Sequence, residues 1–423
     1  MAGETDWQEA WREHVWLPYA QMKHVLPPLP VVATEGTRIK LADGRELVDG
    51  IASWWTACHG YNHPHIRAVV TRQLEAMPHV MFGGLVHEPA VRLATRLAAL
   101  LPGDLDRVFF SDSGSVSVEV AMKMAVQYWL NRGIRGRTKM LAFHGAYHGD
   151  TFATMAMCDP DEGMHKHFAG ILHENIIADL PHDDERAVEL DALVARHADE
   201  LAAIIVEPLV QGAGGMLFHD AEVLRRLRAL ADKYDLLLIF DEVFTGFGRT
   251  GTMFACEAGQ VVPDIICLSK ALTGGTMALA ATVARKKVFQ AFWSDDPAQA
   301  LMHGPTFMAN ALACAAANAS LDLFESEPRL AQVAKIEAAL KAGLEACRDA
   351  PGVRDVRVRG AIGVVELEKI EDLAVLKRRF VARGVFIRPF GKIVYLTPAL
   401  TIDGDDLQRL MDAIVHVMRQ ACD

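Results

Sequence analysis

The sequence predicts an α/β protein in which a large, mainly parallel sheet is joined to a smaller α+β unit. The apolar runs 203–206, 236–240 and 265–268 have the length and composition of strands buried on both faces of a parallel sheet. The connections between strands are long enough for right-handed crossover helices. In the last third, amphipathic helices alternate with short strands, which is typical of an α+β domain.

The chain is long enough to form more than one hydrophobic core. Its 423 residues exceed the size at which a single core stops growing. A content of 51% hydrophobic and 23% charged residues is typical of a well-packed globular protein. We expect an N-terminal segment (1–60) that contributes to a small domain, a large cofactor-binding domain (61–314) and a C-terminal small domain (315–423).

Charge and targeting patterns narrow the classes of partner. The net charge of -11 disfavours nucleic acids and anionic membranes. The start of the chain lacks a signal-peptide pattern, and no stretch approaches 18 uninterrupted apolar residues. The cysteines show no CxxC spacing, so we expect reduced thiols and a cytoplasmic protein. They are Cys58, Cys158, Cys256, Cys267, Cys314, Cys347 and Cys422.

The N-terminal segment is rich in aromatic residues. Residues 6–16 can form a short amphipathic helix, and Pro18 then places Tyr19 on a loop. Short strands follow around a hairpin turn at residues 43–44. Trp54 and Trp55 are adjacent; in a strand they would face opposite sides, so that one could line a pocket, and two core tryptophans are an equal alternative.

Two later segments place small or aromatic residues at the ends of expected strands. Helices are expected over 66–77 and 88–101, and a strand at 108–110 leads through Ser113, Gly114 and Ser115 into a helix. Backbone N–H groups at that helix N-terminus could bind phosphate, although an ordinary N-cap would use the same residues. A strand that ends near Phe143 is followed by Tyr147, an aromatic residue suited to the rim of a ligand site.

Histidines give little support for a metal site. His59, His63 and His65 have no carboxylate or thiol at ligand spacing, and a cluster of His144, His148 and Asp150 is a weaker interpretation than an aromatic rim. We expect no metal.

An acid and a lysine follow two neighbouring strands. The run 236–240 leads into Asp241 and Glu242, and the run 265–268 leads into Lys270. Ligands of open α/β sheets bind outside the carboxyl ends of the strands, so Asp241 and Lys270 are expected on one rim.

The last third adds a basic residue at the end of a strand. Arg388 is the last residue of an expected strand at 385–388 and precedes Pro389, where its guanidinium could hold a carboxylate through two parallel hydrogen bonds. The other expected elements here are helices over 329–346, 370–383 and 405–419 and strands over 353–358, 362–366 and 393–396.

Two cofactors fit parts of this pattern. The string GFGRTG at 246–251 satisfies G-x-G-x-x-G, which raises an NAD-dependent oxidoreductase as a distant alternative. However, five residues separate it from the strand, and no acidic residue ends a strand about 20 positions later. Pyridoxal phosphate fits better, because it needs an acid, a lysine and a phosphate site together.

If the cofactor is pyridoxal phosphate, each of the residues at this rim has a chemical role. Lys270 would form the Schiff base and then carry protons, and Asp241 would keep the ring nitrogen protonated. Tyr147 would stack on the ring. The turn at 113–115 would hold the phosphate.

The motif IIVEP…LLLIFDEVFTGFGRTG…PDIICLSKALTGG resembles the class III, or ω-, aminotransferases of the fold-type I pyridoxal-phosphate enzymes. Within that class, WLPYAQM, DGIASWWTACHGYNHP, MHGPTF and IRPFGKIVYL resemble the members that act in biotin synthesis. For those members the resemblance implies S-adenosylmethionine as amino donor and 8-amino-7-oxononanoate as acceptor. A broad ω-amine:pyruvate aminotransferase of the same class is the nearest alternative.

The resemblance implies roles for three groups of residues. It also implies a homodimer in which the two subunits share their active sites. The catalytic residues implied are Lys270, Asp241 and Tyr19. Cofactor binding is implied for Ser113, Gly114, Ser115, Tyr147, Asp241 and Lys270, with Pro305 and Thr306 contributed by the neighbouring subunit. Substrate binding is implied for Tyr19, Trp54, Tyr147, Lys270, Gly304 and Arg388. The chain departs from the family at Leu17, Ala309 and Ala311, where histidine, glycine and proline are usual.

Overall fold

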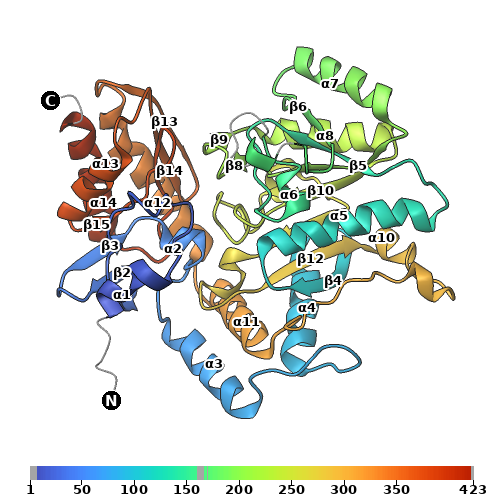
Figure 1. Ribbon diagram of the computed structural model, residues 1–423, viewed down its shortest axis with the longest axis horizontal. Coiled ribbons are helices and arrows are strands. Elements are labelled where there is room, and N and C mark those ends of the chain that lie inside the picture. The colour runs from blue at the N-terminus through green and yellow to red at the C-terminus, as the bar shows by residue number, and fades with distance from the viewer. Residues whose placement is uncertain (1–6, 160–165, 169, 421–423) are drawn as a thin grey trace.

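The computed structural model describes residues 7–159, 166–168 and 170–420. Asp6 of the expected first helix and Cys422 lie outside the described residues. The described chain forms two halves, with the N- and C-terminal segments together in one and the middle of the chain in the other (Figure 1).

The larger half is built on a seven-stranded sheet with the order β4-β12-β11-β10-β7-β5-β6. Strand β12 runs antiparallel to both of its neighbours, and the pairs β10–β11, β10–β7, β5–β7 and β5–β6 are parallel. The expected mainly parallel sheet is therefore confirmed. Its strands are β4 (Leu105–Ser111), β5 (Lys139–Phe143), β6 (Ile176–Ala178), β7 (Leu201–Val206), β10 (Leu237–Asp241), β11 (Ile265–Leu268) and β12 (Ala280–Arg285).

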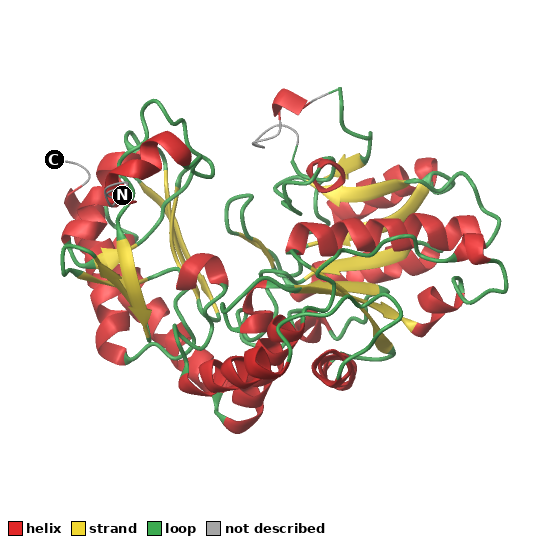
Figure 2. Ribbon diagram, turned by 60° about the horizontal axis from the view of Figure 1, so that its bottom comes forward, coloured by secondary structure: helices red, strands yellow, loops and turns green. Residues whose placement is uncertain are grey.

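Helices cover both faces of this sheet because its central strands are apolar on both sides. Leu237 and Ile239 of β10 pack in one cluster with residues of α5 (Gly114–Asn131), while Leu238 and Phe240 pack in another with residues of α7 (Asp184–His197) and α8 (Ala221–Lys233). Successive side chains of a strand point to opposite faces. Continuous apolar strands thus fix a three-layer arrangement (Figure 2).

The smaller half combines both ends of the chain. A four-stranded sheet contains β1 (Val31–Glu35), β2 (Arg38–Leu41), β3 (Glu46–Asp49) and β15 (Val385–Phe386), in which β3 and β15 pair in parallel. The three-stranded sheet contains β13 (Val353–Arg359), β14 (Ile362–Leu367) and β16 (Ile393–Leu396). The helices of this part are α12 (Arg329–Leu344), α13 (Leu373–Ala382) and α14 (Gly404–Gln420).

Helix α11 (Ala311–Ser326) lies between the halves, against α3 (Pro64–Ala76) and α4 (Glu88–Leu100) (Figure 1). Its alanines let neighbouring helices approach closely, and most of its residues are buried. The remaining elements are short: α1 (Trp7–His14), α2 (Ala52–Trp55), α6 (Phe152–Met155), α9 (Cys256–Gly259), α10 (Lys286–Gln290), β8 (Val210–Gln211), β9 (Leu217–Phe218), and 3₁₀ turns at Lys166–Phe168, Lys270–Thr273, Pro297–Gln299 and Glu345–Cys347.

The expectation of a strand through Trp54 and Trp55 is wrong. Residues 52–55 form α2, in which Ala52, Ser53, Trp54 and Trp55 all have positive φ. The expected division of the pair still holds, because Trp55 is 7% exposed whereas Trp54 is 37% exposed. The backbone, rather than strand alternation, turns the two rings to different surroundings.

Ala309 keeps the left-handed backbone that glycine would supply, with φ +52. Its carbonyl oxygen lies 2.9 Å from His87 Nε2, and the residue is fully buried. A left-handed alanine costs roughly 1 kcal/mol or more relative to glycine. The contacts around it therefore maintain the turn despite the substitution.

Other sequence expectations can be compared directly. The hairpin at residues 43–44 is confirmed by the antiparallel pairing of β2 and β3. Six cysteines are buried and form no disulfide: Cys58, Cys158, Cys256, Cys267, Cys314 and Cys347. Across the described chain, no helix is both long and apolar enough to cross a membrane.

Candidate active site

Asp241 and Lys270 lie at the same edge of the large sheet. Strands β10 and β11 are parallel neighbours, and Asp241 is in register with Cys267. Lys270 begins the 3₁₀ turn that follows β11, with φ +44. The predicted meeting of an acid and an amine at one rim is therefore present in the fold.

A buried histidine holds the carboxylate of Asp241. His148 Nδ1 lies 2.8 Å from Asp241 Oδ2, and the backbone N–H of Val243 donates to Asp241 Oδ1 at 3.1 Å. Asp241 is 5% exposed, and His148 Nε2 has no hydrogen-bond partner among the described residues. Facing a carboxylate, Nδ1 acts as the donor, so His148 orients Asp241 and stabilises its negative charge.

The amine of Lys270 is held in an apolar setting. Burial lowers its pKa to about 8, and the negative charges of Asp241 and Glu207 oppose that shift. Nζ lies 4.5 Å from the ring centroid of Trp55. A lysine with a pKa near 8 can change protonation state close to neutral pH, as a general base must.

The buried amine predicts a pH-dependent change in stability. The folded-state pKa of Lys270 is depressed from 10.5 to about 8, so the penalty for burying its charge is complete below about pH 8 and disappears as pH rises toward 10.5. Lys270→Met should stabilise the cofactor-free chain at pH 7 by at most about 3 kcal/mol, and the gain should shrink as pH rises through 8 to 10.5. Urea unfolding at pH 7 and pH 10 measures it. The exposed Lys392→Met is the control, and an equal gain at both pH values would contradict the prediction.

Two further carboxylates near this edge are buried but differ in their contacts. Glu207, at the end of β7, accepts hydrogen bonds from the backbone N–H groups of Tyr147 (3.0 Å) and Gly212 (2.9 Å), and burial raises its pKa to about 7. Glu242 accepts from the N–H groups of Ala255 and Cys256, and burial likewise raises its pKa to about 7. Glu207 therefore anchors the backbone of a predicted site residue, whereas Glu242 fixes the turn before α9.

The predicted phosphate turn lies at the N-terminus of α5. Ser113 is the N-cap, and its hydroxyl accepts from the backbone N–H of Val116. Ser115 Oγ accepts from the N–H of Asp150 at 3.3 Å, which places this turn beside the loop that carries Tyr147. Gly149 permits the approach, because a Cβ on it would lie 2.2 Å from Ser115 Oγ. An acid, an amine and a helix N-terminus thus form one set, which fits a phosphate-bearing pyridine cofactor.

Aromatic side chains from distant segments form a wall at this site. The rings of Tyr19 and Trp54 are perpendicular, with centroids 5.9 Å apart. The guanidinium carbon of Arg388 lies 4.3 Å from the centroid of Trp54. The hydroxyl of Tyr147 donates to Asp150 Oδ1 at 2.9 Å, and the hydroxyl of Tyr19 also donates to Asp150. Burial and the Asp150 contact raise the pKa of both tyrosines, which keeps their hydroxyls neutral.

The loop containing Gly304, Pro305 and Thr306 lies on the outer surface of the chain, away from the aromatic wall and the candidate cofactor site. Lys123 Nζ donates to the carbonyl of Met302 at 2.8 Å, so the loop contacts α5. Gly304 and Thr306 are exposed. A single chain therefore places these three predicted residues apart from the contacts that join Asp241, Tyr147 and Tyr19.

The GFGRTG string is a packing turn. No long helix follows it, since α9 spans only Cys256–Gly259. The buried Arg249 donates to the carbonyl oxygens of Ala361 (3.1 Å) and Pro398 (2.8 Å). The turn thus fixes the smaller half against the sheet and lacks the strand-to-helix geometry of a nucleotide site.

Neither metal hypothesis gains geometric support: in residues 7–159, 166–168 and 170–420, no three His, Cys, Asp or Glu side chains are grouped to hold an ion.

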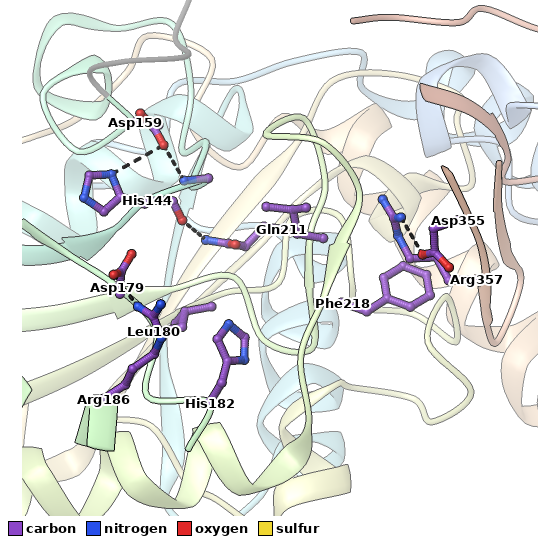
Figure 3. Close-up of a pocket in the computed structure, with 12 residues that line it drawn as sticks. His144, Asp159, Asp179, Leu180, His182, Arg186, Gln211, Phe218, Asp355 and Arg357 are labelled. Atoms are coloured by element: carbon purple, nitrogen blue, oxygen red, sulfur yellow. Dashed lines mark hydrogen bonds and ion pairs between the residues drawn. The ribbon is translucent and has the colours of Figure 1, made fainter. Parts of the chain in front are cut away.

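A separate polar cavity of about 580 Å³ is lined by the segments that follow β5 and β6, by the start of α7 and by the β8–β9 hairpin, with β13 at one side (Figure 3). Its charged groups are paired within the protein: Asp159 lies 3.6 Å from His144, and Arg186 pairs with Asp179. Arg357 donates to the carbonyl of Met216 at 2.8 Å and so joins the halves. The described residues that line this cavity include neither Asp241 nor Lys270, so it is separate from the candidate active site.

Three residues with clear contacts at the site received no role from the sequence. They are His148, which the sequence suggests only as a weak metal ligand, Glu207, which directly follows the apolar run 203–206, and Trp55, which the sequence suggests only as a core or pocket residue. The pairing of His148 with Asp241 spans 93 positions of the chain. No local spacing signals such a contact, because only the strand order brings the two loops together.

Comparisons with known proteins agree with this geometry. A profile of the family described as aminotransferase class-III matches residues 19–418. The adenosylmethionine-8-amino-7-oxononanoate aminotransferase of Mycobacterium leprae is 48% identical over 413 residues, covering 96% of this chain and 94% of that protein.

Solved structures give the same result. The crystal structure of an adenosylmethionine-8-amino-7-oxononanoate aminotransferase from Methanocaldococcus jannaschii is 30% identical, with a TM-score of 0.94 and 98% of both chains covered. A PLP-bound amine transaminase from an uncultivated Pseudomonas species is 30% identical, with a TM-score of 0.90, covering 97% of this chain and 99% of that one.

Proposed function

This chain belongs to the class-III aminotransferases, and from that premise we propose that it aminates 8-amino-7-oxononanoate to 7,8-diaminononanoate in biotin biosynthesis, with S-adenosylmethionine as the amino donor. The observation that carries the proposal is the 48% identity, over 96% of the chain, to a protein named for that reaction. The cofactor is pyridoxal 5'-phosphate, as in this family. When bound, it supplies a conjugated ring that accepts the electron pair left on a substrate carbon.

The residues at the sheet edge supply binding and proton transfer. The carboxylate of Asp241 would pair with the ring nitrogen of the cofactor and favour its protonated form, and His148 orients that carboxylate through the 2.8 Å contact between Nδ1 and Oδ2. Lys270 is the amine that attaches the cofactor and moves a proton from the substrate carbon through Nζ. The first turn of α5, with Ser113, Gly114 and Ser115, would bind the phosphate, and Tyr147 would cover the ring.

Substrate binding falls to the aromatic wall and its arginine. Tyr19, Trp54 and Tyr147 present ring faces and hydroxyls that suit an aliphatic chain, an adenine or a sulfonium cation. Arg388, stacked on Trp54, is placed to receive the carboxylate of the oxononanoate. Tyr19 also contributes to catalysis, because its hydroxyl network with Asp150 orders the substrate beside Lys270.

A homodimer is part of the proposal, with Gly304, Pro305 and Thr306 completing the neighbouring subunit's site. The supporting surface is apolar and exposed: Val86 is 74% and Met302 is 76% exposed, and the ring of Phe307 lies 4.5 Å from that of His79. Contiguous exposed apolar surface commonly marks an interface. Sedimentation of the purified protein tests this, since a monomer at micromolar concentration would contradict it.

The proposal also covers the limits of the domains and the location of the protein in the cell. Residues 1–60 and 315–423 form the small domain and 61–314 the large one, with the parallel β3–β15 pair supporting the union of the two ends. A cytoplasmic location accords with six buried, unpaired thiols.

The function is tested by comparing amino donors and acceptors on the purified holoenzyme. Diaminononanoate should form from 8-amino-7-oxononanoate and S-adenosylmethionine, with lysine as a control donor. The likeness to an amine transaminase favours an ω-amine:pyruvate aminotransferase as the second candidate. Rapid alanine formation from pyruvate and simple amines, without diaminononanoate, would support that candidate instead.

Arg388→Ala should weaken binding of the oxononanoate far more than it slows the chemistry. Removing a charge-assisted hydrogen-bonding partner of a carboxylate costs about 2–3 kcal/mol, so KM should rise by roughly 30- to 160-fold while kcat changes by only a few fold. Steady-state kinetics with varied oxononanoate measure this. Arg378→Ala, an exposed arginine on α13, is the matched control, and an unchanged KM would remove Arg388 from the carboxylate site.

A further inference from the structure

The amine of Lys270 lies close to two aromatic rings. Its Nζ lies 4.5 Å from the centroid of Trp55 and 5.9 Å from that of Phe244. In the described part of the chain Nζ makes neither a hydrogen bond nor an ion pair. The nearby titratable groups are the carboxylates of Asp241 and Glu207 and the hydroxyl of Tyr395, whose ring contacts Trp55.

The indole of Trp55 is firmly fixed in this position. It is 7% exposed, its centroid lies 4.2 Å from that of Phe244, and Tyr395 meets it nearly edge-on at 6.2 Å. Its φ of +76 belongs to the left-handed turn of residues 52–55. Trp54 receives Arg388 on its face. The two adjacent tryptophans therefore each face a different cation.

We propose that Trp55 is a positioning residue for the catalytic lysine, and that its ring face holds the free ammonium of Lys270 by a cation–π contact. The inference rests on the proposed function, in which the amine is released from the cofactor during each half of the reaction. The neutral amine takes a proton from the substrate carbon and becomes ammonium on the face of Trp55. It would then pass that proton to the carbon that gives up or receives the amino group in exchange, and be neutral again.

An aromatic face suits this task better than a carboxylate does. A carboxylate in contact would hold the lysine in its charged form and make it a poor base near neutral pH. A desolvated cation–π contact is weaker, so it can orient the ammonium while both protonation states stay accessible. Burial lowers the pKa of Lys270 to about 8, which is consistent with such a balance.

The test measures the protonation of Lys270 directly in the full-length, cofactor-free chain. Labelling with acetic anhydride across pH 6 to 11, read out by mass spectrometry of the Lys270 peptide, gives the midpoint of its titration. Trp55→Leu should lower that midpoint by about one pH unit, which corresponds to about 1.4 kcal/mol. Trp55→Phe, which retains a ring face, should restore part of the shift.

Fluorinated tryptophans at position 55 separate the electrostatic role from packing. Each added fluorine withdraws electron density from the ring face and changes its shape little, so the Lys270 midpoint should fall stepwise with fluorine number. The same series at Trp54 is the control and should leave the Lys270 midpoint unchanged. If fluorination at Trp55 leaves the Lys270 midpoint unchanged, the proposal is overturned, even where Trp55→Leu fails to fold. The readout needs no substrate, so its outcome is distinct from failure of the proposed reaction.

Discussion

Replacing Lys270 with alanine is expected to reduce amino transfer by more than about 10⁴-fold, the largest effect of any single substitution in this chain. The variant loses the amine that attaches the cofactor and the base that moves the substrate proton. General acid–base catalysis alone contributes about 10²- to 10⁴-fold, and loss of the covalent step adds to this. Diaminononanoate formation and the visible absorbance of the cofactor-loaded protein measure the two losses separately.

Two further experiments test whether the charge or the reactive amine of the Lys270 side chain is the group that matters. Lys270→Arg keeps a cation at the site but cannot deprotonate near neutral pH, so it should be as inactive as Lys270→Ala. Small primary amines added to Lys270→Ala should restore some proton transfer, because the removed side chain leaves space beside Trp55. Normal turnover by Lys270→Ala would refute the assignment of Lys270.

Asp241→Asn is expected to lower kcat/KM by at least about 10³-fold, equivalent to about 4 kcal/mol of transition-state stabilisation. An amide has nearly the same shape but no charge, so it cannot hold a proton at the ring nitrogen, and the cofactor ring then attracts electrons less strongly. Single-turnover rates of each half-reaction measure the loss. The exposed Asp220→Asn is the matched control.

A substitution of His148, the partner of Asp241, should have a smaller effect. His148→Gln keeps a hydrogen-bond donor near Asp241 Oδ2 but no imidazole, and should cost less than Asp241→Asn because the carboxylate remains. Equal losses of kcat/KM in the two variants, with unchanged melting temperatures, would show that catalysis does not depend on the charge of Asp241 alone.

Local sequence patterns predicted the strands and most helices well. Apolar runs such as 236–240 and 265–268 are recognisable because both faces of a central parallel strand are buried, and the amphipathic helices show their buried stripe by spacing. The segment at Trp54 and Trp55 was mispredicted because its residues prefer strands, whereas the packing of Trp55 between Phe244 and Tyr395 imposes a left-handed turn. Tertiary contacts overrode local propensity there.

The sequence by itself determined the chemistry of the site: an acid and a lysine follow two buried strands, and a Ser-Gly-Ser turn starts a helix. Only the tertiary structure decided which groups tune that chemistry. His148 meets Asp241 across 93 positions, Glu207 anchors the backbone of Tyr147, and Trp55 lies 4.5 Å from the amine of Lys270. The physical reason is that residue type and strand position are local properties, whereas hydrogen-bond partners, burial and ring contacts depend on strand order and on the packing of the two halves.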